Sequence, residues 1–160
     1  MSKNIKGFAS DLALPDRTAT EALGARIAAG LRPGDAVALE GDLGAGKTAL
    51  ARAILRALGV DGAVPSPTFT LVQCYETATI VVRHYDLYRI ERAAELDELG
   101  LDEALNDGAA LIEWPERAEG RLPVDALHVR LTITGENSRE VHLAGPSHWV
   151  AVFPETMHAD

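Results

Sequence analysis

A run of three glycines, one lysine and one threonine has the residue types that phosphate binding needs. Residues 41–48 read Gly-Asp-Leu-Gly-Ala-Gly-Lys-Thr and match the pattern G-x-x-x-x-G-K-[ST]. Glycine permits the backbone angles that turn several N–H groups towards one anion. Lys47 can reach the β- and γ-phosphates as a positive charge, and the Thr48 hydroxyl can bind Mg²⁺. The predicted nucleotide contacts from this run are Asp42, Leu43, Gly44, Ala45, Gly46, Lys47 and Thr48.

The segments on either side of this run predict the strand and the helix that a phosphate loop requires. Ala36–Glu40 is short and mostly apolar, which is typical of a buried strand. Residues 48–58 predict a helix, and Gly59 suits the position just after it. A helix that begins near Thr48 turns unpaired N–H groups and the positive end of its dipole towards a bound anion. We therefore expect bound nucleotide, and not protein packing, to offset the cost of the glycines.

Two acidic residues that each follow a predicted strand could complete a phosphate–Mg²⁺ site. Glu113 ends the more apolar strand and is favoured as the metal partner, acting through a water. Asp86 ends a hairpin-like strand with an arginine and a histidine, so we expect that strand to be less deeply buried. Asp86 is then expected on the γ-phosphate side, as a water-positioning group or base. The predicted catalytic residues are Lys47, Asp86 and Glu113, and the predicted metal ligands are Thr48 and Glu113.

A proline-rich loop and a tryptophan are candidates for sensing the nucleotide state. Residues 64–70 lie between the phosphate-loop helix and the next strand, where the γ-phosphate-sensing switch loops of P-loop proteins lie. Ser66 and Thr68 offer hydroxyls there, although a plain proline turn is an equal alternative. Trp114 follows Glu113 directly and could stack on a base or cover the phosphates, whereas a lone tryptophan is more often part of a core. The predicted switch and partner-sensing residues are Ser66, Pro67, Thr68 and Trp114.

The remaining periodicity predicts an α/β fold. Thr18 and Glu21 have capping-box spacing at the start of a helix near 19–30. Strands are expected at 71–76, 80–85, 109–113, 127–133, 139–143 and 148–153, and an acidic helix at 93–105. Strand, helix and strand in the first half favour a parallel sheet, and the hairpins add antiparallel strands. The predicted fold is a P-loop NTPase three-layer sandwich with a mixed parallel and antiparallel sheet, in a single domain over residues 1–160.

The composition limits what the protein binds by itself. The chain has a net charge of −9 and a pI of about 5.0, whereas counterion release on nucleic acid requires a basic surface. The same charge argues against anionic membranes, and no stretch approaches the length of a membrane span. Cys74 is the only cysteine, which excludes an internal disulfide and a cysteine-based zinc site. The five histidines lack metal-ligand spacing and are interpreted as surface or satisfied polar residues. A reducing cytoplasm is the expected location.

Four motifs follow one another along the chain: GDLGAGKT, SPTFTLV, HYDLYRI and LIEWPE. Together they closely resemble the bacterial TsaE (YjeE) family, the ATPase of tRNA threonylcarbamoyladenosine (t6A) synthesis. The resemblance extends from about Leu14 to Glu116, and more weakly through the hairpin at 127–143. It implies that ATP binds the glycine loop and that Mg²⁺ is held by Thr48 and Glu113.

The resemblance also implies roles outside the glycine loop. Asp86 matches the aspartate of the family's H-x-D-x-Y-R motif, and residues 66–68 match its S-P-T switch. The segment before the first helix lies near the adenine in that family, so Arg17 or Thr18 is expected to contact the base. Residues 135–140 resemble the family's basic hairpin turn only loosely, which gives little support to a nucleotide contact from Arg139.

The activity implied by the resemblance is that of a weak ATPase that does not itself transfer the threonylcarbamoyl group. It joins the transferase subunit TsaD and its paralogue TsaB, and its ATP cycle resets that complex. Hydrolysis is then expected to be slow alone and faster with the partners. The tRNA is held by those partners and reaches this protein only indirectly, in keeping with the acidic charge.

Three other functions share parts of the same pattern. A small-metabolite kinase would also use a P-loop, but it needs an acceptor pocket and an arginine-bearing lid, for which Arg117 and Arg121 are weak candidates. A guanine-specific switch protein would carry an N-K-x-D motif, and none occurs. A nucleotide-gated binding module without hydrolysis is not distinguished by sequence from a weak ATPase, so a turnover assay must separate them.

Overall fold

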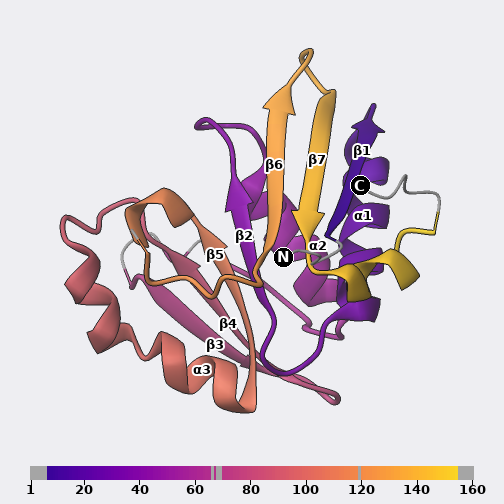
Figure 1. Cartoon of the computed structure of the whole chain (residues 1–160). Coiled ribbons are helices and arrows are strands. Elements are labelled where there is room, and N and C mark those ends of the chain that lie inside the picture. The colour runs from indigo at the N-terminus through magenta and orange to yellow at the C-terminus, as the bar shows by residue number, and fades with distance from the viewer. Residues whose placement is uncertain (1–6, 66, 68–69, 119, 155–160) are drawn as a thin grey trace.

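Residues 7–65, 67, 70–118 and 120–154, which the computed structural model describes, form a seven-stranded sheet with helices on both faces (Figure 1). The strand order is β1-β7-β6-β2-β5-β4-β3. Four neighbouring strands at its centre are parallel: β2 (Ala36–Glu40), β4 (Val81–Asp86), β5 (Gly108–Glu113) and β6 (Leu127–Ile133). Every residue of β5 is buried, as expected for a parallel strand covered on both faces.

Antiparallel strands complete the sheet on both sides. β7 (Arg139–Gly145) pairs with β6 and with β1 (Phe8–Leu14), and β3 (Val72–Glu76) pairs with β4. The predicted α/β class and the mixed sheet are therefore confirmed. The sequence pattern did not predict β1.

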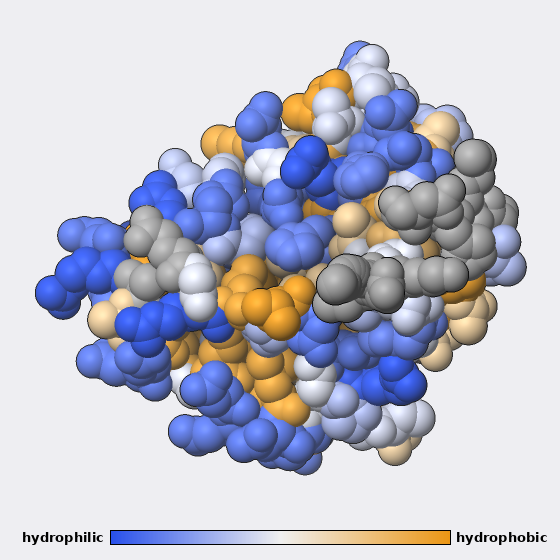
Figure 2. Space-filling view, in the orientation of Figure 1, coloured by the Kyte–Doolittle hydropathy of each residue, from blue (hydrophilic) through white to orange (hydrophobic). Residues whose placement is uncertain are grey.

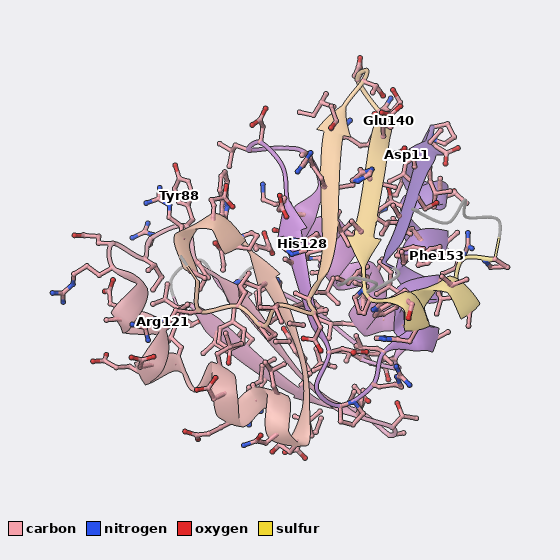
Figure 3. All side chains as sticks on the ribbon, viewed as in Figure 1. Asp11, Tyr88, Arg121, His128, Glu140 and Phe153 are labelled. Atoms are coloured by element: carbon pink, nitrogen blue, oxygen red, sulfur yellow. The ribbon has the colours of Figure 1, made fainter. Side chains whose placement is uncertain are left out.

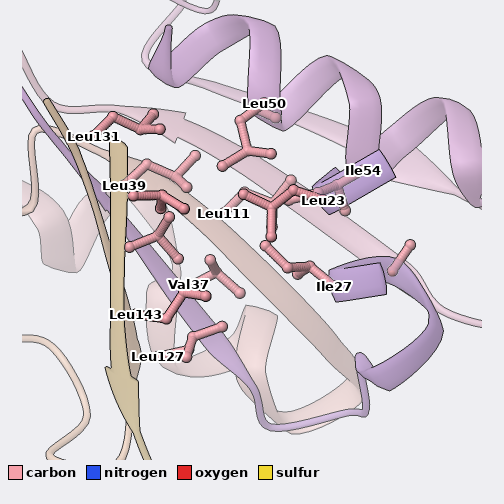
Figure 4. Close-up of a cluster of buried hydrophobic side chains, with 14 of the residues drawn as sticks. Leu23, Ile27, Val37, Leu39, Leu50, Ile54, Leu111, Leu127, Leu131 and Leu143 are labelled. Atoms are coloured by element: carbon pink, nitrogen blue, oxygen red, sulfur yellow. The ribbon is translucent and has the colours of Figure 1, made fainter. Parts of the chain in front are cut away.

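The two faces of the sheet carry different helices. On one face lie α1 (Arg17–Gly30) and α2 (Lys47–Ala57), and Figure 4 shows their leucines and isoleucines packed against side chains from β2, β5, β6 and β7. On the other face, a separate apolar cluster involves the 3₁₀ helix η1 (Ala93–Leu99) and α3 (Leu101–Asp107). Successive residues of a strand point to opposite faces, so β2, β4 and β5 contribute to both clusters, whereas β6 contributes only to the first.

Three local predictions are wrong in detail. The first helix begins at Arg17 because the Asp16 carboxylate accepts a hydrogen bond from the Ala19 N–H at 3.0 Å, so Thr18 is not its cap. The helix expected at 93–105 is divided by Gly100, whose φ is +68°. The strand expected at 148–153 is instead the 3₁₀ helix η3 (Ser147–Ala151).

Phe153 follows this 3₁₀ helix and lies on the side of the molecule with β1 and α1 (Figure 3). Its ring stacks on Phe8 with ring centroids 5.5 Å apart.

Apolar side chains that remain outside are few in the described part of the chain. The face seen in Figure 2 is mainly hydrophilic, with apolar residues gathered near its centre. The exposed large hydrophobic residues that the structure describes are Leu43, Tyr88, Val124 and Ile133. Over the same residues, every helix is too short or too polar to cross a bilayer.

Candidate functional site

The glycine run forms the loop between β2 and α2. The φ angles of Gly41, Gly44 and Gly46 are +147°, +85° and +107°, a region that other residues rarely adopt. At Gly41 a Cβ atom would also lie 2.7 Å from the Leu131 carbonyl oxygen. Gly46 precedes α2 and makes no side-chain cap, so the first N–H groups of this helix are left without a capping side chain. The predicted strand–loop–helix arrangement is therefore present, with N–H donors where an anion would bind.

The Lys47 ammonium group is buried within this loop. Its Nζ donates hydrogen bonds to the Gly41 and Asp42 carbonyl oxygens at 2.5 and 3.0 Å, and lies 4.0 Å from the centre of the Trp114 ring. Burial lowers the pKa of Lys47 from its usual 10.5, while nearby acidic side chains, Glu113 foremost, oppose that shift. A cation held next to an anion-binding loop is what a phosphate site requires.

Thr48 and Glu113 meet although 65 residues separate them. The Thr48 Oγ1 donates to Glu113 Oε1 at 2.8 Å, and Glu113 is only 2 % exposed. Two oxygen groups at this spacing suit Mg²⁺, which prefers oxygen ligands and keeps several waters. No cluster of three or more His, Cys, Asp or Glu side chains suited to a metal occurs among the described residues. Phosphate and water oxygens would therefore have to supply the other ligands.

The strand that carries Asp86 is more deeply buried than the sequence suggested. β4 lies between β3 and β5, and Asp86 is 5 % exposed, so the expectation of a less buried strand is wrong. The reason is that β4 pairs in parallel with β5, which places Asp86 directly beside Glu113 in register. Asp86 Oδ1 accepts a hydrogen bond from the Tyr88 N–H at 3.0 Å. Both predicted acids thus end neighbouring strands on the same edge of the sheet.

His84 is a site residue that the sequence reading missed. Its side chain is fully buried, and Nε2 lies 2.6 Å from Glu113 Oε2. The missed signal is its spacing: His84 precedes Asp86 by two residues on one strand, so both side chains point to the same face. The interpretation of His84 as a surface residue is therefore wrong, while its pairing with Glu113 makes it a partly satisfied polar group.

The structure describes Trp114 and part of the proline loop. Trp114 has a φ of +59°, precedes the 3₁₀ helix η2 (Pro115–Ala118) and packs on Tyr88 with ring centroids 4.9 Å apart. Pro67 is buried, and its carbonyl oxygen accepts from the Leu71 N–H at 2.6 Å. Ser66 and Thr68, the predicted switch hydroxyls, lie outside the described residues. Arg52 of α2 holds the start of this loop by donating from Nε to the Val64 carbonyl oxygen at 2.6 Å.

A cavity of about 1240 Å³ adjoins the other side of the glycine loop. It meets the loop at Ala45 and Gly46, whereas Lys47, Thr48 and Glu113 are not part of its lining. Of the two residues expected to contact the base, Arg17 lines this cavity and Thr18 does not. The cavity is lined by these residues: Asp16, Arg17, Thr20, Glu21, Ala45, Gly46, Ala49, Arg52, Ala53, Arg56, Ala57, Ala63, Val64, Pro65, Leu131, Glu136, Asn137 and Arg139.

Arg139 connects the β6–β7 hairpin to the loop. Its Nε and Nη2 donate to the Ala45 and Gly44 carbonyl oxygens at 3.0 and 3.1 Å. The loose match of this segment to a basic hairpin turn gave Arg139 little weight in the sequence. The structure places it on the loop backbone and in the cavity lining, because β6 pairs with β2 directly before the loop.

Comparison with known proteins identifies the family. The family model described as "Threonylcarbamoyl adenosine biosynthesis protein TsaE" matches residues 14–141. The chain belongs to the TsaE family. A TsaE relative from Rickettsia felis, named a tRNA threonylcarbamoyladenosine biosynthesis protein, is 42% identical over 129 residues, which are 80% of this chain and 75% of the relative. The Bacillus subtilis TsaE protein of the same name is 39% identical over 123 residues, 76% of this chain and 77% of the relative.

A solved structure supports the fold of this TsaE family member. The crystal structure of Bacillus subtilis YdiB aligns with a TM-score of 0.77 and 29% sequence identity, covering 96% of each chain. The family match contains the loop, His84, Asp86 and Glu113. It also includes Arg139, which contacts the loop from the hairpin.

Proposed function

We propose that the protein binds ATP with Mg²⁺ and hydrolyses it slowly, as the ATPase subunit of t6A biosynthesis. The observation that carries the proposal is the meeting of Lys47 and Thr48, at the start of α2, with Glu113 at the end of β5. This arrangement puts helix N–H groups, a cation and oxygen ligands around one point. The TsaE relatives named for t6A biosynthesis support the pathway.

Each residue has a distinct task in this proposal. The ammonium of Lys47 leaves the loop carbonyls and binds the β- and γ-phosphates, while Thr48 and Glu113 hold Mg²⁺, Glu113 acting directly or through a water. A Mg²⁺ ion held there would supply positive charge against the negative charge that develops on the leaving group. The cavity on the other side of the loop would take the base and sugar, with Arg17 and Arg139 at its wall.

Asp86 is proposed to orient the attacking water. The water oxygen bonds to the γ-phosphorus, the bond to the β–γ bridging oxygen breaks, and ADP leaves. The water's proton is released to solvent with inorganic phosphate. Asp86 is suited to this task because it lies beside Glu113 in register and contributes to the negative field at Lys47.

Partner subunits of the TsaD and TsaB type are proposed to accelerate hydrolysis in the cytoplasm, with tRNA held by those partners. Arg83 flanks Asp86 in sequence but forms an ion pair with Asp107 at 3.1 Å, away from the loop. Arg139 contacts the loop but donates to its carbonyl oxygens, so an arginine that stabilises the transition state is proposed to come in trans. Trp114, between Lys47 and the exposed Tyr88, is suited to report nucleotide state to a docked subunit.

The small-metabolite kinase alternative has less support. Its lid candidate Arg121 donates to Asp97 at 2.6 Å, and Arg117 lies near the Tyr88 ring and donates to the Ile90 carbonyl oxygen at 3.5 Å. Both arginines are thus engaged in contacts within the chain. A kinase would also phosphorylate a small acceptor, which gives a direct way to separate the two activities.

The deciding experiment measures phosphate release from ATP by the purified protein, alone and with the TsaD–TsaB pair. We expect slow release alone and faster release with the pair, because the partners supply the missing positive charge. Trp114→Ala should reduce the stimulation more than it reduces ATP binding. Equal rates with and without partners would contradict the proposal, as would phosphate transfer to a metabolite in place of water.

A further inference from the structure

The carboxylate of Glu113 is held at both oxygens. Thr48 donates to Oε1 at 2.8 Å, and the other oxygen, Oε2, lies 2.6 Å from Nε2 of His84. A buried carboxylate without donors is costly, and here each oxygen has one donor. Only Thr48 belongs to the phosphate loop, and His84 takes no part in the chemistry proposed above.

The sheet fixes the imidazole ring in place. β4 and β5 pair in parallel with Asp86 opposite Glu113, so His84 lies one pleat behind the acid on the same face. The ring is fully buried and cannot turn towards water. A carboxylate oxygen only accepts hydrogen bonds, so Nε2 is the donor to Oε2. The other ring nitrogen, Nδ1, has no hydrogen-bond partner among the described residues. Among the described residues, the contact of Nε2 with Glu113 is therefore the only hydrogen bond of the ring.

We propose that His84 is a positioning residue that holds Oε2 so that Oε1 faces the Thr48 hydroxyl, where the metal would bind. The inference rests on the function proposed above. If a metal took the place of the Thr48 hydrogen bond at Oε1, the contact of His84 with Oε2 would remain. The side chain of Glu113 therefore keeps one orientation before and after binding. Partners behind a metal ligand act in this way in other metal sites, where their loss weakens metal affinity.

The test compares His84→Leu, which removes the donor, with His84→Gln, whose amide nitrogen can take the place of Nε2. Val82→Ala is the control, because Val82 is buried on the same strand and face but pairs with Ala109, away from Glu113. For each variant, binding of a fluorescent ATP analogue is titrated at increasing Mg²⁺, with a metal-free titration beside it. Thermal unfolding of each variant reports its stability separately.

We expect His84→Leu to raise the Mg²⁺ concentration for half-maximal binding about tenfold or more, with little change in metal-free affinity. His84→Gln should restore most of the difference, and Val82→Ala should change only the melting temperature. A wild-type protein whose nucleotide binding ignores Mg²⁺ would overturn both the proposed function and this inference. Mg²⁺-dependent wild-type binding with an unchanged midpoint in His84→Leu would overturn the inference alone.

A second measurement needs no variant that might unfold the protein. Nitrogen-15 NMR of the histidine rings distinguishes a proton on Nε2 from a proton on Nδ1. We expect the buried histidine, identified by its slow exchange with solvent, to carry its proton on Nε2. A proton on Nδ1 instead would remove the donor to Glu113 and overturn the inference.

Discussion

The two faces of the sheet use the same strands for different purposes. On the face with α1 and α2, β4 and β5 end in His84, Asp86 and Glu113. On the face with η1 and α3, the same strands present Tyr85 and Ile112 to an apolar cluster. Strand alternation alone assigns each residue to one face, so neighbours in sequence have unrelated roles.

The difference between the faces follows from what each helix layer offers. The start of α2 brings N–H groups, Lys47 and Thr48 to the first face, so buried acids there find partners. On the second face the Tyr85 hydroxyl donates to the Leu99 carbonyl oxygen at 3.1 Å, and the cluster is otherwise built from apolar side chains. One face is therefore expected to control ligand binding and the other mainly stability, which mutations can test.

The largest expected effect comes from the apolar face. Ile112 is 1% exposed, so Ile112→Ala should lower the free energy of unfolding by about 2–5 kcal/mol through lost burial and a cavity. Urea unfolding measures it. The matched control is Ile133→Ala, because Ile133 is 48% exposed and its loss should cost within about 0.5 kcal/mol. Equal losses in the two variants would contradict this comparison.

The next effect concerns ligand binding on the first face. Lys47→Ala should weaken ATP binding at least about tenfold, since a charge-assisted contact contributes about 1.5–3 kcal/mol. Calorimetry on the folded variant checks it, with Ile112→Ala as the control that loses stability and keeps its affinity. Unchanged affinity in Lys47→Ala would refute the phosphate role of the loop.

The two acids on the first face should be separable from each other. Glu113→Gln keeps the shape but removes the charge, and should weaken the Mg²⁺ dependence of nucleotide binding. Asp86→Asn should leave binding nearly intact and lower the hydrolysis rate. Nucleotide titrations with and without Mg²⁺, together with phosphate release, measure both. If Asp86→Asn abolishes Mg²⁺-dependent binding while Glu113→Gln does not, the roles are reversed.

The smallest expected effect concerns Tyr85 on the apolar face, and it is confined to alkaline pH. Burial raises its pKa from 10.0 to about 12. The folded protein therefore keeps a proton that the unfolded chain releases, so stability should fall as pH rises from about 10 to about 12 and be unaffected at pH 7. Absorbance titration of the phenolate, compared with Tyr85→Phe, measures it. Titration of all tyrosines near pH 10 would show that the apolar face admits water.

Local patterns predicted much of the fold and half of the site. The strands at Ala36–Glu40 and Leu127–Ile133 and the helix after the glycine loop were predicted within a residue, because their periodicity and glycines are local. The pairing of Thr48 with Glu113 was also anticipated, from the family resemblance and from the strand-end position of the acid. The burial of Asp86 was not anticipated, because it depends on β5 lying beside β4.

The sequence by itself determined the chemistry of the loop. The loop needs positive φ angles, and the ability to adopt them is a property of glycine itself. Only the tertiary structure decided which distant groups complete it. His84 reaches Glu113 through the parallel register of two strands, and Arg139 reaches the loop because β6 lies beside β2. These contacts join residues far apart in the chain, and strand order, which no local pattern encodes, brings them together.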